Sequence, residues 1–230
     1  MTAKKTNPFK LRDFRGVDPR HLERLEKLKI KNAGQMLAAG ATKKQRVALA
    51  KEAGVPVAVD LDIAPSNTIM QYIGTADQYL AVAKMADILK PCDAAAIELA
   101  GTDDLEQAIQ KIHKEFGNKL TAITAAAKGS VLFDGKNVHW EEVLDLSKVG
   151  RKLVDPCGAG DAYFGGMNAA ISLFGLDAPL EDIGTLANAT AGLCCSAEGA
   201  FPVAPESPKG EIRKLIAANR GEDVAAKLID

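Results

Sequence analysis

Apolar residues near the start of the chain recur every three or four positions, which is the spacing of a helix. Residues 16–30 read GVDPRHLERLEKLKI, with Pro19 near the predicted helix start and Asp18 before it as the expected N-cap. The apolar stripe consists of Val17, Leu22, Leu25, Leu28 and Ile30. Two more short helical segments follow, punctuated by Gly34, Gly40 and Gly54. The pattern predicts a small all-helical module over residues 1–54.

From residue 55 the period of the apolar residues changes to that of strands. Residues 55–63 (VPVAVDLDI) are rich in valine and too few for a typical helix, so they predict a strand. Residues 86–91 (ADILKP) and 120–124 (LTAIT) predict two more strands. Residues 130–140 (SVLFDGKNVHW) predict a hairpin that turns at Asp134-Gly135.

Helical patterns alternate with these strands. Residues 102–117 (TDDLEQAIQKIHKEFG) place leucine, isoleucine and phenylalanine on one face and end at a glycine. Residues 161–175 and 180–197 predict two further helices, and a polar C-terminal helix is expected near 207–228. Strands that alternate with helices indicate an α/β fold with a largely parallel sheet.

The charge of the chain is divided unevenly between its segments. Residues 1–54 hold 14 Lys and Arg against 5 Asp and Glu, a net charge of +9, whereas the remainder holds 15 against 25, a net of −10. Such a division favours two modules with different partners, or with each other as partner. We expect the basic helical module over 1–54, an α/β core over 55–206 and a C-terminal helix over 207–230.

The N-terminal module leaves two interpretations open. GVDPRHLERLEKLKI resembles a helix-hairpin-helix unit, in which a glycine-containing turn joins two helices, and some such units hold nucleic-acid phosphates. Short turns between amphipathic helices are common, so we expect a basic helical cap or a docking surface instead. Its partner would be another protein or a second copy of the chain, rather than nucleic acid.

Several classes of protein are disfavoured by composition. No apolar run approaches the roughly 18 residues that a membrane helix needs, and the first residues lack the apolar middle of a signal peptide. The four cysteines show neither metal-site nor disulfide-framework spacing, and the three histidines are scattered. We therefore expect a reduced cytoplasmic protein with no metal-ligating residues.

Residues 154–166 (VDPCGAGDAYFGG) carry the candidate chemistry. Gly158, Ala159 and Gly160 expose backbone N–H groups at the start of a helix, where the helix dipole favours an anion such as phosphate. Asp161 follows directly and is placed to accept a proton from a hydroxyl beside that phosphate. The combination is suited to phosphoryl transfer to an alcohol. From these residues alone, a tight loop with Asp161 as a helix cap is an equally good interpretation.

The loop and its surroundings resemble the PfkB carbohydrate kinase family, which has the ribokinase-like fold. DPCGAGD followed by AYFGGMNAA is similar to the family signature D-T-x-G-A-G-D. Residues 121–135 resemble its T-x-G-x-x-G segment, residues 86–101 the segment that carries N-x-x-E, and residues 186–201 a late helix near the adenine. The resemblance spans roughly residues 55–205.

The resemblance implies a role for each matching residue. Asp161 would be the base, and Gly158, Ala159 and Gly160 would form the anion hole. The residues that would hold the loop or line the nucleotide pocket are Thr124, Gly129, Asp155 and Asn188. The cofactors would be ATP and Mg²⁺, with magnesium bridging the ATP phosphates. The acceptor would be a hydroxyl of a sugar or a similar small alcohol.

The sequence also departs from the family pattern. The asparagine and glutamate of N-x-x-E fall at Cys92 and Ala95, the first glycine of T-x-G-x-x-G is Ala126, and Pro156 replaces the threonine of the signature. Residues 1–54 contain nothing like the family's sugar-binding half. These departures support an alternative, a weak or inactive kinase-derived protein that binds nucleotide or acts as a scaffold.

Two pairs of carboxylates have no assigned chemistry. Asp60 and Asp62 alternate at the end of the first predicted strand. Two interpretations are equally good: one of them faces the nucleotide edge of the sheet, or they are solvent-exposed or turn residues. Glu141 and Glu142 are interpreted as solvated surface charges.

Overall fold

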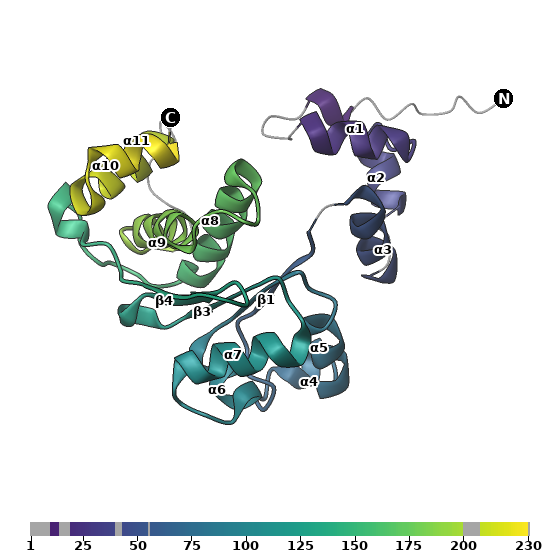
Figure 1. The fold of residues 1–230 in the computed structure, drawn as a ribbon, viewed down its shortest axis with the longest axis horizontal. Helices are drawn as coiled ribbons and strands as arrows, with labels where there is room; N and C mark the ends of the chain where they lie inside the picture. The colour runs from purple at the N-terminus through teal and green to yellow at the C-terminus, as the bar shows by residue number, and fades with distance from the viewer. Residues whose placement is uncertain (1–9, 14–18, 40–42, 55, 200–207, 230) are drawn as a thin grey trace. The chain divides into compact units, whose positions relative to one another are not determined.

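The computed structural model describes residues 10–13, 19–39, 43–54, 56–199 and 208–229. The chain divides into two compact units, residues 1–57 and 58–230 (Figure 1). Asp18, the expected N-cap, and Gly40 lie outside the described residues.

The first unit is helical, as its apolar spacing predicts. Its elements are η1 (Leu11–Asp13), α1 (Pro19–Lys27), α2 (Ala33–Ala39) and α3 (Lys43–Ala53). A small cluster of Leu25, Ile30 and Ala53 is buried between them. Arg24 closes the unit by donating a hydrogen bond of 2.8 Å from its guanidinium to the Gly54 carbonyl oxygen.

The second unit is built on one five-stranded sheet in the order β1-β2-β3-β4-β5. Its strands are β1 (Ala58–Leu61), β2 (Ile88–Pro91), β3 (Leu120–Thr124), β4 (Ser130–Phe133) and β5 (Val138–Glu141). The first three strands run parallel, and β4 and β5 form the predicted antiparallel hairpin. The sheet is therefore mixed, and only its β1–β3 part is parallel.

Helices cover both faces of this sheet (Figure 1). On one face lie α4 (Met70–Ile73), α5 (Ala76–Ala83), α6 (Asp93–Ala100) and α7 (Leu105–Phe116). On the other lie α8 (Ala159–Phe174) and α9 (Leu180–Cys195), with α10 (Pro208–Arg220) and α11 (Glu222–Ile229) beyond them. Two short turns, η2 (Ala126–Lys128) and η3 (Leu146–Val149), complete the unit. One apolar cluster fills each side of the sheet, so the core has two layers.

The expected single C-terminal helix is wrong, since the chain forms α10 and α11 instead. Gly221 separates them with φ of 99°, in the left-handed region that a continuing helix cannot use. Helix α10 packs against α9, and Leu215 and Ile216 bury its apolar side.

The position of α8 is set by its close packing on α9. A Cβ added at Gly166 would lie 2.6 Å from the Thr190 hydroxyl oxygen and 2.9 Å from the Ala187 Cα, so only glycine permits this approach. Tyr163, near the start of α8, is buried in the apolar cluster on this side of the sheet. The N-terminus of α8 lies at the carboxyl end of β1, where Gly160 approaches the Asp62 side chain.

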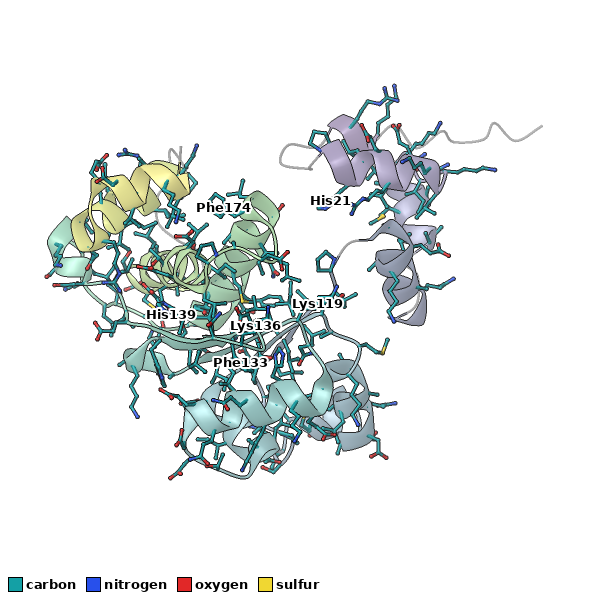
Figure 2. All side chains as sticks on the ribbon, in the orientation of Figure 1. His21, Lys119, Phe133, Lys136, His139 and Phe174 are labelled. Atoms are coloured by element: carbon teal, nitrogen blue, oxygen red, sulfur yellow. The ribbon has the colours of Figure 1, made fainter. Side chains whose placement is uncertain are left out.

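Glu141 is an interior residue, and its interpretation as a solvated charge is wrong. Its side chain is 3% exposed and accepts hydrogen bonds from the Thr185 hydroxyl at 2.9 Å and the Arg220 guanidinium at 3.0 Å. The His139 Nε2 lies 2.8 Å from its other oxygen (Figure 2 labels His139 on β5). The carboxylate thus joins β5 to α9 and α10, which is possible because each of its oxygens has a partner.

Among the described residues, no helix is both long enough and apolar enough to cross a membrane.

Candidate functional site

The candidate site lies where the carboxyl ends of the parallel strands meet the N-terminus of α8. Open α/β sheets bind their ligands at this edge, because the loops after the strands diverge there. Asp60 comes from β1 and Asp62 follows it, Lys90 comes from β2, and Gly160 and Asp161 open α8.

The loop before α8 leaves backbone amides without helical partners at the start of the helix, an arrangement that suits an anion. Gly158 is the N-cap, with φ of 76° in the left-handed region. The amides of Gly160 and Asp161 belong to the first helical turn, which has no carbonyl partner inside the helix, and the helix dipole adds positive potential there. The Ala159 amide donates a hydrogen bond of 3.1 Å to the Pro156 carbonyl, so in this conformation it is already engaged.

Asp155 ties the loop to the end of α9. One of its carboxylate oxygens accepts from the Cys157 amide at 2.9 Å and the other from the Gly199 amide at 3.0 Å. These two hydrogen bonds hold the pKa of Asp155 below its usual value, because they favour the ionised form. The Asp155 amide donates in turn to the Cys195 carbonyl.

The three other predicted nucleotide-pocket residues lie on β3, its turn and α9. Gly129 turns the chain between β3 and β4 with φ of 91°, and an added Cβ would lie 2.0 Å from the Glu141 carbonyl oxygen. The Asn188 side chain is buried and donates to the Glu141 and Glu142 carbonyl oxygens at 3.0 and 3.1 Å. Gly129 and Asn188 therefore meet at the backbone of Glu141, whereas Thr124 lies at the end of β3 beside Cys92.

Lys90 is the site residue that the sequence reasoning missed. Its side chain is fully buried, and its ammonium bonds the two Asp60 oxygens at 2.9 and 3.1 Å. It also bonds one oxygen of Asp62. A Cβ added at Gly160 would lie 3.1 Å from this ammonium and 3.2 Å from the Asp62 oxygens. The ion cluster Asp60-Asp62-Lys90 therefore packs directly against the backbone of the phosphate loop.

A signal for this cluster was present in the sequence. Lys90 is the one charged residue in the buried strand Ile88–Pro91, and a buried ammonium requires carboxylate partners. Asp60 supplies one, since it is paired with Lys90 directly across the parallel β1–β2 ladder. Recognising the pair requires the register of the two strands.

Asp161 joins this cluster from α8. Asp60, Asp62 and Asp161 each place a carboxylate oxygen within 4.8 Å of the other two. Burial raises the pKa of Asp60 to about 7; Lys90 lowers it in part and the neighbouring Asp62 raises it further.

The cluster does not fit a resident magnesium ion, although its three carboxylates have a suitable spacing. The Lys90 ammonium already bonds two of them and would repel a divalent cation. The positions that match N-x-x-E are a cysteine and an alanine, so neither offers a side-chain oxygen. Cys92 is the N-cap residue of α6, and Ala95 is fully buried. The nearby Glu98 accepts a hydrogen bond from the Ser66 hydroxyl at 2.6 Å.

Ala126 shows what one departure from the family pattern does to the backbone. Its φ is 49°, in the left-handed region, where a residue with a Cβ is strained. The glycine that the T-x-G-x-x-G pattern has at this position would adopt the same conformation without strain.

Relatives with known names support a kinase fold. The chain is similar to the cytidine kinase of Thermococcus kodakarensis, with 31% identity over 102 residues, which are 44% of this chain and 35% of that protein. Ribokinase of Arabidopsis thaliana, solved with ribose and ATP, aligns over 81% of this chain and 51% of its own, with 24% identity and a TM-score of 0.54. A ribokinase II structure from E. coli with ATP and Mg²⁺ aligns over 68% and 47%, with 22% identity and a TM-score of 0.57. The chain thus spans between a third and about half of the length of these relatives.

The family assignment rests on a longer match than any single relative provides. The sequence model of the pfkB family carbohydrate kinases matches residues 38–206. This match covers more than half of the chain and includes every residue of the candidate site. The five-stranded sheet with helices on both faces agrees with the ribokinase-like structures. The chain belongs to the pfkB family of carbohydrate kinases.

Proposed function

We propose that this protein transfers the γ-phosphoryl group of ATP to a hydroxyl of a sugar, a nucleoside or a similar small alcohol. The observation that carries the proposal is the position of Asp161, whose carboxylate stands in the first turn of α8 beside the amides of the phosphate loop. Family membership and the kinases with similar folds support the same reaction class.

In the proposed reaction Asp161 accepts the proton of the acceptor hydroxyl. The acceptor oxygen forms a bond to the γ-phosphorus as the bond from that phosphorus to the ADP oxygen breaks. The amides of Gly158, Ala159 and Gly160 stabilise the charge on the transferring group, and Ala159 first releases the Pro156 carbonyl to do so. ADP then leaves with the electron pair of the broken bond.

The nucleotide would lie over β3 and its turn. We assign Thr124, Gly129 and Asn188 to this pocket, while Asp155 holds the loop in place through its two amide contacts. Magnesium would arrive with ATP and would offset negative charge on its phosphates. Because the chain spans about half of the solved kinases, we further propose that a second copy or another protein completes the acceptor pocket, with the basic residues 1–54 as docking surface.

An ATP-consumption screen over sugars and nucleosides tests the proposal. The wild-type protein is compared with Asp161→Asn and with the control Asp103→Asn, an exposed carboxylate before α7. We expect Asp161→Asn to lower kcat by about 10²- to 10⁴-fold, which is the usual contribution of a positioned base, and Asp103→Asn to leave it unchanged. Equal turnover of wild type and Asp161→Asn would exclude Asp161 as the base.

A second candidate function is nucleotide binding without transfer. The absence of a side-chain oxygen at both Cys92 and Ala95 favours it, because those positions organise phosphate and metal-bound water in the resembled family. Calorimetric titration with Mg-ATP separates the two functions. Binding together with no turnover on any acceptor supports the second function, and no heat at millimolar Mg-ATP contradicts both.

A further inference from the structure

The proposed reaction makes no use of Lys90, the most deeply buried charge of the site. An ammonium out of water is strongly unfavourable unless carboxylates pair with it, and Lys90 has two, Asp60 and Asp62. A lysine held in this way cannot reach a ligand without giving up a partner. Its effect on the site is therefore exerted through those carboxylates.

The charges around Asp161 do not balance. Three carboxylates meet within 4.8 Å, and Lys90 is the cation bonded to two of them. Other titratable groups that interact with these carboxylates are Tyr79 of α5 and Cys92 before α6, which interact with Asp62, and Cys194 of α9, which interacts with Asp161. Each of them is neutral when protonated and negative when ionised, and the charged neighbours Asp93, Glu98 and Asp155 are carboxylates, so none of these groups replaces the positive charge of Lys90.

We propose that Lys90 is a positioning residue of this site: its ammonium holds Asp60 and Asp62 together beneath the first turn of α8 and offsets their repulsion of Asp161. The inference rests on the proposed function, which it deepens by naming the group that keeps the base ionised. The close approach at Gly160 supports it, because the cluster touches the backbone that carries Asp161.

The physical reason is the interaction of like charges at short range. Without the ammonium, Asp60, Asp62 and Asp161 would hold their negative charges at short range with no cation bonded to them, so the group takes up protons at higher pH. A protonated Asp161 cannot accept the proton of the acceptor. The loss of Lys90 should consequently appear as a shift along the pH axis, which a purely structural role would not produce.

The test compares two pairs of proteins that differ only in the ammonium. The first pair consists of the wild type and Lys90→Met. The second pair consists of Asp60→Asn and the double variant Asp60→Asn/Lys90→Met. The double variant has lost both charges of the Lys90–Asp60 ion pair. Lys119→Met is the matched control, because Lys119 pairs with Asp87 at 3.2 Å with a largely exposed side chain. The readouts are the acid limb of the pH–rate profile and the titration midpoint of the Asp161 carboxyl, followed by carbon NMR.

We expect the midpoint of Asp161 to rise by about one pH unit or more when Lys90 is replaced, in both pairs, and to stay unchanged in Lys119→Met. If Lys90→Met does not fold, the second pair decides alone, since the double variant buries no uncompensated charge. Equal midpoints within the folded pairs would overturn the proposal. If the wild type has no turnover on any acceptor, the proposed function fails, whereas the NMR titration still tests the role of Lys90.

Discussion

At the scale of single residues, Gly160 shows why the phosphate loop needs a residue without a side chain. Its backbone is helical, so no unusual φ explains the glycine. The explanation is the ion cluster beneath it, because a methyl group would lie 3.1 Å from the Lys90 ammonium. The loop before Asp161 and the ion cluster therefore meet at the Gly160 backbone.

Gly160→Ala should reduce the proposed activity because it displaces either the loop or the cluster by a few tenths of an ångström. We expect kcat/KM to fall by about ten- to a hundredfold, since small misplacements are costly in phosphoryl transfer. The control is Gly165→Ala in the same helix, where a Cβ meets nothing within 4 Å. The prediction is contradicted if steady-state kinetics rank the two variants equally.

Asp60 should make the protein less stable as the pH rises. Its pKa is about 7 in the folded protein against an ordinary 3.8, so between these values the folded state holds a proton that the unfolded state has lost. Raising the pH through this window therefore lowers the free energy of unfolding. Urea unfolding at pH 4.5 and 7.5 measures this, and Asp60→Asn should lose the Asp60 part of the slope. An identical slope in both proteins would show that Asp60 does not titrate in this range.

At the scale of elements, the hairpin and the helices that flank it are joined by polar contacts as well as by apolar packing. Glu141 of β5 bonds Thr185 of α9 and Arg220 of α10, while Asn188 of α9 bonds the backbone at the end of β5. Gly129 allows the β3–β4 turn to pass against the same backbone. Gly129 and Asn188, which we assign to the proposed nucleotide pocket, therefore lie where the hairpin and α9 are joined by these contacts.

The turn η2 carries strain that one substitution should relieve. Ala126 has φ of 49°, so Ala126→Gly should stabilise the protein by about 1 kcal/mol, because glycine adopts this conformation freely. The neighbouring Ala127→Gly serves as control and should destabilise by about 0.5–1 kcal/mol, since Ala127 lacks the positive φ. Chemical denaturation of both variants gives the two differences. Effects of the same sign would contradict the strain at Ala126.

At the scale of the whole molecule, the unit of residues 58–230 contains its own core. The two apolar clusters on either side of its sheet are formed by residues from Ala58 onward, and the three-residue cluster of the first unit is separate. The candidate site lies wholly within the second unit.

A protein of residues 58–230 should consequently fold and keep the proposed nucleotide site. We expect a single cooperative thermal transition by circular dichroism and an affinity for Mg-ATP within about threefold of the full chain, an estimate that treats the two units as independent domains. Loss of the cooperative transition would mean that the first unit supplies part of the core. Retained folding with lost Mg-ATP binding would place part of the nucleotide site in residues 1–57.

Local patterns in the sequence predicted most strands and helices of the second unit and the place of the Gly-Ala-Gly-Asp loop at a helix start. The Asp134-Gly135 pair predicted the hairpin, one apolar face predicted α7, and helix-like stretches predicted α8 and α9. The Gly-Ala-Gly-Asp run indicated a helix N-terminus with a carboxylate beside it, which is what α8 has. These features follow from residues close together in the chain, so a linear pattern contains them.

Only the tertiary structure decided what surrounds that loop. Asp60 and Lys90 are 30 positions apart and meet because β1 and β2 pair in parallel with one particular register. Glu141 is buried because α9 and α10 return to β5 from 44 and 79 positions away. Contacts of this kind depend on strand order, strand register and helix packing. Sequences with the same local pattern can differ in all three, so the pattern alone does not specify these contacts. Which charged side chains lie beside Asp161 is therefore decided by the assembly of the sheet.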